Sequence, residues 1–142
     1  MNKPARIENE ETLTKFIHDV DGLHDALLHE AVLLHPGYVD QGGRMFGDVE
    51  LPGARLIFQS QFADIAAVQL DMKGVSTFRL EWKLDFRLEA EIKDGAVVLY
   101  LSGRQFSPVS EIRAAEAEYT MLGAEFRGPE YKLVRGGVDF DV

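Results

Sequence analysis

The stretch Phe78–Lys93, FRLEWKLDFRLEAEIK, alternates apolar and charged side chains without an exception. A strict period of two is typical of a strand with one face buried and the other in water. At ~3.3 Å per residue the run would extend about 50 Å, which is longer than an ordinary strand. We therefore expect either a bend or bulge near Trp82 and Lys83, or passage of the run from one sheet into a second one.

The two residues that follow this run, Asp94-Gly95, are a strong signal for a tight hairpin turn. Such a turn would carry the chain back through Val97–Leu101, a segment that is apolar on both sides and predicts either a central strand or the seam of a dimer. It would also leave Val98 and Tyr100 on the charged face, beside Glu91 and Glu89. The predicted opposite pairs are Lys93 with Ala96, Ile92 with Val97, Ala90 with Leu99 and Leu88 with Leu101.

A second hairpin is predicted just before the alternating run. Val68, Leu70 and Met72 share one face of their segment. A three-residue loop, Lys73–Val75, would place them opposite Leu80, Phe78 and Ser76, with Gly74 at the position that needs a positive φ.

The remaining elements are predicted from local signals. Asn9 is a good N-cap for a helix over Glu10–Val20, which Gly22 can end. His24–Leu34 is apolar-rich, and a strand is favoured over a helix because Pro36-Gly37 follows. Ser110–Leu122 fits a helical stripe or one side of a strand, and propensity favours the helix. Further expectations are strands at Ala54–Ser60 and Phe62–Met72, a long loop or irregular hairpin at Tyr38–Gly53, and extended or frayed ends at residues 1–8 and 127–142.

Composition narrows the classes of partner. The 142 residues suit a single domain, and 15 basic against 24 acidic residues give a net charge of −9. This charge disfavours nucleic acid and anionic membranes as partners and suits a basic protein. With no cysteine in the chain, disulfides and thiolate chemistry are excluded. We expect a cytoplasmic protein, since no signal peptide and no apolar run of membrane-spanning length is recognised.

The four histidines lie close together in the sequence, among several acidic residues. Imidazole and carboxylate groups are ligands for zinc or iron, but spacings of six, five and six match no familiar pair of metal ligands. Asp25 and His29 would share a face of a helix, whereas on a strand they lie roughly 13 Å apart. His24, Asp25 and His29 are therefore candidate ligand-binding residues, and the alternative is that they are turn and capping residues. The cluster runs from His18 to His35.

No catalytic residue and no cofactor is predicted. No serine lies in a Gly-x-Ser-x-Gly turn, and Gly42-Gly43-Arg44 lacks the context of a phosphate loop. Glu89 and Glu91 could in principle serve as an acid and base pair, but the alternation explains them as the solvated face of a strand. Trp82 falls on the apolar face and is expected in the core.

The order of the elements resembles that of small bacterial β-rich proteins, among them immunity proteins of polymorphic toxin systems. The segments that carry the resemblance are the N-terminal helix, Leu23–Leu28, Ala54–Phe58, Gly74-Val75 and Ile112–Ala115. The resemblance implies that the late segment, Ser110–Leu122, is a strand, and that the protein binds a partner rather than catalyses a reaction.

The expected fold is α+β, mainly an antiparallel meander of about six strands, strongly bent, with an N-terminal helix on its apolar face. The leading functional hypothesis is a non-enzymatic binding protein that inhibits a basic protein through its acidic surface. Two alternatives remain open: a small-molecule carrier with a β-enclosed apolar cavity, and a metal-dependent enzyme that uses the histidine cluster. A homodimer also remains open.

Overall fold

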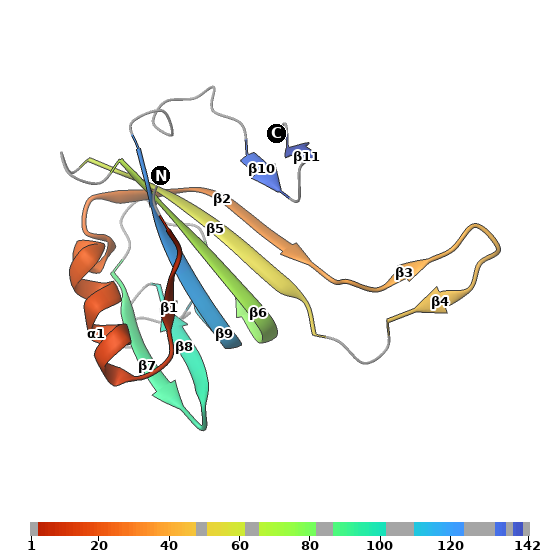
Figure 1. The fold of residues 1–142 in the computed structure, drawn as a ribbon, viewed down its shortest axis with the longest axis horizontal. Coiled ribbons are helices and arrows are strands. Elements are labelled where there is room, and N and C mark those ends of the chain that lie inside the picture. The colour runs from red at the N-terminus through yellow and green to blue at the C-terminus, as the bar shows by residue number, and fades with distance from the viewer. Residues whose placement is uncertain are drawn as a thin grey trace.

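A computed structural model describes residues 3–47, 51–61, 66–81, 87–101, 110–123, 133–135 and 138–140. Most of the described residues are in strands, and the helix α1 lies between the first strand and the others (Figure 1). The elements are β1 (Ala5–Ile7), α1 (Glu10–Asp19), a 3₁₀ turn (Asp21–Leu23), β2 (Ala26–Leu34), β3 (Tyr38–Val39), β4 (Met45–Phe46), β5 (Gly53–Ser60), β6 (Ala67–Arg79), β7 (Glu89–Lys93), β8 (Ala96–Tyr100), β9 (Glu111–Leu122), β10 (Leu133–Arg135) and β11 (Val138–Phe140).

The main sheet has seven strands, and its order is β2-β5-β6-β9-β8-β7, with β1 added beside β9. Each of these pairs is antiparallel. One edge of β9 serves two neighbours, because β8 pairs with Glu111–Ala114 and β1 pairs with Ala117–Tyr119. The predicted α+β class, a mainly antiparallel sheet with an N-terminal helix, is confirmed.

Helix α1 begins where the sequence predicts. The side chain of Asn9 accepts a hydrogen bond of 2.9 Å from the Thr12 N–H, and Thr12 Oγ1 accepts one of 3.0 Å from the Asn9 N–H. This reciprocal pair satisfies two of the N–H groups that a helix start leaves without partners. The helix ends at Asp19, one residue before the predicted end, and Gly22 follows in the left-handed conformation with φ +59°.

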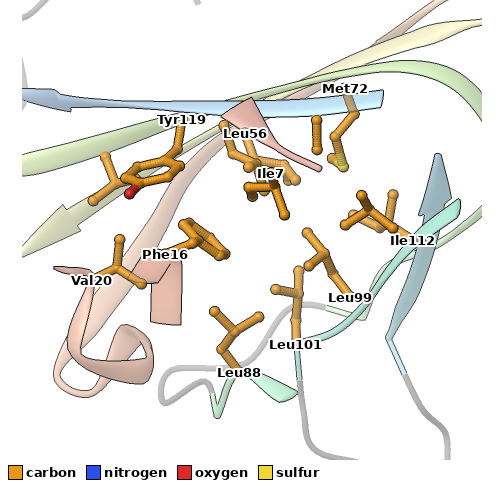
Figure 2. Packing of buried hydrophobic residues seen from close by; sticks show 14 of the residues in the cluster. Ile7, Phe16, Val20, Leu56, Met72, Leu88, Leu99, Leu101, Ile112 and Tyr119 are labelled. Carbon is orange, nitrogen blue, oxygen red and sulfur yellow. The ribbon is translucent and has the colours of Figure 1, made fainter. Parts of the chain in front are cut away.

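The core lies between α1 and one face of the sheet, which we call the inner face (Figure 2). Phe16 packs on the ring of Tyr119 with centroids 4.8 Å apart, and Val20 lies beside them. Leu99 and Leu101 of the β8 segment, with Ile112 of β9, close the other side of the cluster. Full burial of each such side chain contributes roughly 1.5–3 kcal/mol relative to an exposed one. The packed cluster attaches α1 firmly to the sheet.

The alternating stretch at residues 78–93 is not one strand. Strand β6 ends at Arg79, Leu80 and Glu81 lie outside the strands, and β7 begins only at Glu89. The expected bend at residues 82–83, like the core position of Trp82, lies outside the described residues. Both strands belong to the same sheet, so passage into a second sheet is wrong.

The predicted hairpin at residues 73–75 is wrong. Strand β6 continues through Gly74 and pairs with β9 on both sides of it, from Ala67 to Arg79. Gly74 does adopt a positive φ of +65°, but it changes the facing of the side chains instead of reversing the chain. A bulge between Val75 and Thr77 changes the facing once more. The inward positions are therefore Val68, Leu70, Met72 and Val75, with Phe78 and Leu80 packed against the core beyond them.

The Asp94-Gly95 hairpin is confirmed, with Lys93 opposite Ala96, Ile92 opposite Val97 and Ala90 opposite Leu99. The pairing ends at Glu89 and Tyr100, and the predicted partners Leu88 and Leu101 are both buried in the core. Strand β8 lies between β7 and β9, so the apolar segment is a central strand and not an outer seam.

The face of the sheet opposite the core, the outer face, is less open than predicted. Glu89 and Glu91 are half-buried, and Val98 and Ile57 are fully buried on this face. The Tyr100 hydroxyl donates a hydrogen bond of 2.9 Å to Glu91. The charged side of this hairpin is therefore packed in part and not simply solvated.

Two ambiguous segments are strands. His24–Leu34 contains β2, and Ser110–Leu122 contains β9, which pairs along its whole length with β6. Tertiary pairing overrides helix propensity in β9. The predicted strand Ala54–Ser60 is confirmed as part of β5, and the later part of Phe62–Met72 lies in β6. Near the termini, residues 5–7 are extended and add a strand to the sheet, whereas β10 and β11 form a separate hairpin.

Candidate functional site

The exposed apolar side chains gather in one part of the molecule. Within the described part of the chain, the large apolar residues that are exposed all lie between Leu27 and Leu51. Seven of them lie between the end of β2 and the start of β5, and we call this set the apolar arm: Leu33, Leu34, Tyr38, Val39, Met45, Phe46 and Leu51. A gathering of exposed apolar side chains on a folded protein is typical of a binding surface.

The hairpin β3–β4 projects from the sheet, at the end of the molecule opposite α1 (Figure 1). Tyr38 lies opposite Phe46 and Val39 lies opposite Met45. Because side chains alternate across strands, the aromatic pair lies on one face of the hairpin and the aliphatic pair on the other. Met45 is 80% exposed and Tyr38 61% exposed, so both faces of the hairpin present apolar surface to solvent.

The hairpin is internally ordered. The rings of Tyr38 and Phe46 stack with centroids 5.1 Å apart, and the guanidinium of Arg44 lies 5.7 Å from the centre of the Phe46 ring. Asp40 Oδ1 accepts hydrogen bonds of 2.9 Å from the N–H groups of Gly42 and Arg44, which holds the turn. A two-stranded hairpin has little stability alone, so these contacts fix its shape before any partner binds.

Close backbone contact fixes the base of the arm. Gly47 has φ +102°, and a Cβ added there would lie 2.4 Å from the Cα of Gly37. No side chain fits at that point, so the two glycines let the two chains of the arm meet. The side chain of His35 accepts a hydrogen bond of 2.8 Å from the Gly37 N–H, which holds the same turn.

A groove of about 610 Å³ runs along the base of the arm. Its walls come from the end of β2, the start of β5 and the distortion in β6. The lining is mainly apolar, with Lys73 as its basic group, and the volume lies within the range of small-molecule sites. The lining residues are Leu34, His35, Pro36, Leu51, Gly53, Lys73 and Gly74.

Beside this groove the outer face carries ion pairs between neighbouring strands. Arg55 lies directly opposite Asp71, and their side chains are joined by a contact of 2.6 Å that Gln69 extends with a hydrogen bond of 2.8 Å to the same carboxylate. Farther along, Arg6 binds Glu116 at 3.4 Å. These charges neutralise one another in pairs, which is an arrangement that stabilises a sheet face.

The three sequence candidates lie on a turn and on the following strand. His24 Nδ1 is 3.0 Å from Asp25 Oδ2, and both side chains are largely exposed. Asp25 has φ +57°, so the pair belongs to the tight turn that leads into β2. His29 lies at the bulge of β2, between the registers set by Leu28 and Glu30. The structure thus brings His24 and Asp25 together and places His29 in the strand beyond them.

The histidine cluster does not close around a common point. His18 is 89% exposed at the end of α1, and the ring of His35 is engaged in the turn of the arm. Among the described residues, which include all four histidines, no group of three His, Asp or Glu side chains is placed to hold a metal ion. The hypothesis of a metal-dependent enzyme gains no geometric support.

Glu30 is an unusual group on β2. It faces outward opposite Ile57, and its Oε2 atom is buried without a hydrogen-bond partner among the described residues. Burial raises the pKa of Glu30, although the nearby His29 opposes the shift. An unsatisfied buried carboxylate oxygen costs folding free energy and has to be explained.

The arm is the feature that sequence reasoning missed. Tyr38-Val39 and Met45-Phe46 flank a turn rich in glycine, and this symmetry could have indicated a short apolar hairpin. Strands of two residues carry no period, so the segment gives only the signal of an irregular hairpin.

No helix in the described residues is long and apolar enough to cross a membrane. Comparison of the chain with models of protein families, with curated proteins and with solved structures finds no match in any of the three.

Proposed function

We propose that this chain is a non-enzymatic binding protein that holds a basic protein partner through the apolar arm. The observation that carries the proposal is that, in the described part of the chain, seven of the eight exposed large apolar side chains belong to the apolar arm, which includes the projecting hairpin. Interface centres are rich in Tyr, Phe and Met, and Tyr38, Phe46 and Met45 supply all three residue types here.

The net charge supports the basic character of the partner. At −9 the chain attracts a basic protein over long range and repels an acidic one. In such a complex the apolar arm provides the buried contact. The net charge raises the rate of association with a basic protein and disfavours acidic partners. Inhibition of the partner, which is the activity expected of an immunity-type protein, is the proposed consequence of this binding.

The arm can be tested with a variant that keeps its strand propensity. In V39T/M45T the aliphatic face of the hairpin becomes polar, whereas the aromatic pair and the turn remain. Tagged wild-type protein and the variant are expressed in the native cell, and the captured proteins are quantified by mass spectrometry.

We expect a protein of high isoelectric point that the wild type captures at least tenfold more than the variant, with capture that weakens as salt rises. A matched control, K93T, changes an exposed residue at the far hairpin and is expected to capture as the wild type does. Equal capture by V39T/M45T, or a partner of acidic isoelectric point, would contradict the proposal.

A second candidate function is the transport of a small molecule, and the groove at the arm base favours it. The ligand class that fits is an apolar molecule with an anionic group, because Lys73 is the basic side chain in a lining that is otherwise apolar except for His35. This groove differs from the β-enclosed cavity that the sequence suggests, since the inner face of the sheet is filled by core side chains (Figure 2). Native mass spectrometry of freshly purified protein tests it: an added mass that is lost in K73A supports transport, and bare protein argues against it.

A further inference from the structure

We propose that β2 pairs with the β2 strand of a second copy of this chain, so that two sheets join edge to edge about a two-fold axis between His29 and Glu30. This inference goes beyond the proposed function, because it concerns the edge of the sheet and not the hairpin that projects past it. Either proposal can fail without the other.

The edge itself is available. β2 is the first strand in the sheet order, and its other side pairs with no strand among the described residues. It is nine residues long, and Leu27 and Leu33 are exposed on it. Proteins usually protect such an edge, since its row of N–H and C=O groups can pair with another chain.

The bulge at His29 decides which pairing is allowed. Before the bulge the inward residues are Ala26 and Leu28, which lie opposite Ser60 and Phe58 of β5. After it they are Ala31 and Leu33, opposite Leu56 and Ala54. The inward positions therefore have even numbers before the bulge and odd numbers after it. When two β2 strands pair antiparallel, the part before the bulge in one copy lies opposite the part after the bulge in the other copy.

One register satisfies this condition along the whole strand. It places inward residues against inward ones, and the outward Leu27 against the outward Val32 of the second copy, with both apolar. The opposite pairs are Ala26 with Leu33, Leu27 with Val32, Leu28 with Ala31, and His29 with Glu30. A shift of the register by two residues in either direction brings an inward residue against an outward one or against the bulge near the axis.

The same register places a polar partner beside Glu30. Its Oε2 atom is buried without a hydrogen-bond partner in the described part of a single chain. In the paired strands the imidazole of His29 from the second copy would lie directly opposite, and the relation would be repeated by symmetry. The complementary pair His29–Glu30 thus occurs twice at the centre of the interface, where it opposes the repulsion between two acidic chains.

The joined sheet would also orient the arms. In each copy the projecting hairpin β3–β4 of the arm follows Leu34, at the end of β2. Antiparallel strands send the two arms past opposite ends of the joined edge, so the dimer presents two separate binding surfaces.

The test uses two charge variants of the full chain, H29E and E30K. Each variant alone places unfavourable partners together. In H29E the new carboxylate faces the native Glu30 of the second copy, and in E30K the new ammonium faces the native His29. When the two variants are mixed, the new carboxylate of one chain lies opposite the new ammonium of the other, and the native Glu30 and His29 remain opposite each other.

Sedimentation at up to about 100 µM chain measures the dimer. We expect the wild type to be dimeric and each variant alone to have a dissociation constant at least tenfold weaker. In the mixture we expect the wild-type dissociation constant to be recovered.

A second measurement fixes the register even if a charge variant folds poorly. The chain has no cysteine, so L27C and V32C each introduce a single thiol. Under mild oxidation the proposed register predicts a disulfide between L27C and V32C chains when they are mixed, and little in either variant alone. Wild-type protein that stays monomeric overturns the proposal. A dimer that neither recovers in the charge mixture nor forms the mixed disulfide overturns it equally.

Discussion

The hydroxyl of Tyr119 donates a hydrogen bond of 2.7 Å to Oδ2 of Asp19, which connects the central strand β9 to the last residue of α1. Lys15 binds the same carboxylate oxygen from one helical turn earlier, at 2.5 Å. Tyr119 is buried and its ring packs on Phe16. One polar contact within an apolar cluster thus fixes the position of the helix on the sheet.

Y119F removes this hydrogen bond and keeps the ring. We expect the free energy of unfolding to fall by about 1–2 kcal/mol, because the acceptor is ionised and the donor lies in the core. Denaturation by urea measures it. The control is Y38F on the exposed arm, which should change stability by less than about 0.5 kcal/mol. An equal effect of the two substitutions would show that the Tyr119 contact contributes nothing.

The same contact predicts how stability depends on pH. Burial acts to raise the pKa of Asp19, but hydrogen bonds from Lys15 and Tyr119 outweigh it and hold the pKa below its ordinary value of 3.8. The unfolded chain then binds the proton more tightly, so this stabilisation is present above pH 3.8 and is lost as pH falls toward the folded pKa.

At alkaline pH the dependence has the opposite sign, so that stability falls as pH rises. Burial, together with the hydrogen bond to Asp19, raises the pKa of Tyr119 above its ordinary value of 10.0. Stability is therefore complete below pH 10.0 and is lost as pH rises toward the folded pKa. Thermal melting of the wild type and Y119F from acid to alkaline pH tests both statements. The melting temperatures of the two proteins should converge at the acid end and at the alkaline end of the pH range. A difference in melting temperature that stays constant with pH would contradict both statements.

Gly74 should tolerate no side chain. It has φ +65°, and a Cβ added there would lie 2.9 Å from the Cβ of Ala115 on β9. We expect G74A to lower the free energy of unfolding by about 1–3 kcal/mol, through backbone strain and this overlap. In G95A only the strain applies, because φ is +78° and no atom lies within 4 Å of the new Cβ.

A double-mutant cycle separates the two causes in G74A. Replacement of Ala115 by glycine removes the overlapping methyl group, so G74A/A115G should be more stable than the sum of the two single effects implies. Additive effects in chemical denaturation would mean that the Ala115 methyl group is not what excludes a side chain from this position.

The arm should contribute little to the stability of the fold. In V39T/M45T both substituted side chains are more than half exposed, so we expect a change of less than about 0.5 kcal/mol in the free energy of unfolding. In contrast, L56A removes a fully buried side chain and should cost about 2–5 kcal/mol. A large loss in the arm variant would indicate that its apolar residues serve folding and not binding.

The predictable parts of the fold are those that local chemistry decides. The Asp94-Gly95 turn and the alternation around it indicate the same register, and the structure has that register. Asn9 likewise marks the start of α1 in both. Gly74 shows the limit: a hairpin turn and a distortion within a strand both need a positive φ, and only the continuous pairing of β6 with β9 distinguishes them.

Other features depend on distant neighbours. Glu111–Leu122 has the composition of a helix, but it is a strand because β6, β8 and β1 all pair with it. The candidates His24, Asp25 and His29 could be found by residue type, yet their separation along a turn and a strand depends on the fold. The arm could not be predicted as a surface, because exposure is a property of the packed chain.

The central claim is that the arm contacts a basic protein, and photo-crosslinking in the native cell tests it most directly. A photoreactive phenylalanine analogue is placed at Met45, the most exposed residue of the arm, and at Lys93 as the control position. The account predicts that illumination joins the chain to one basic protein from position 45 and not from position 93. Equal crosslinking from both positions, none from position 45, or an acidic protein captured there would contradict it.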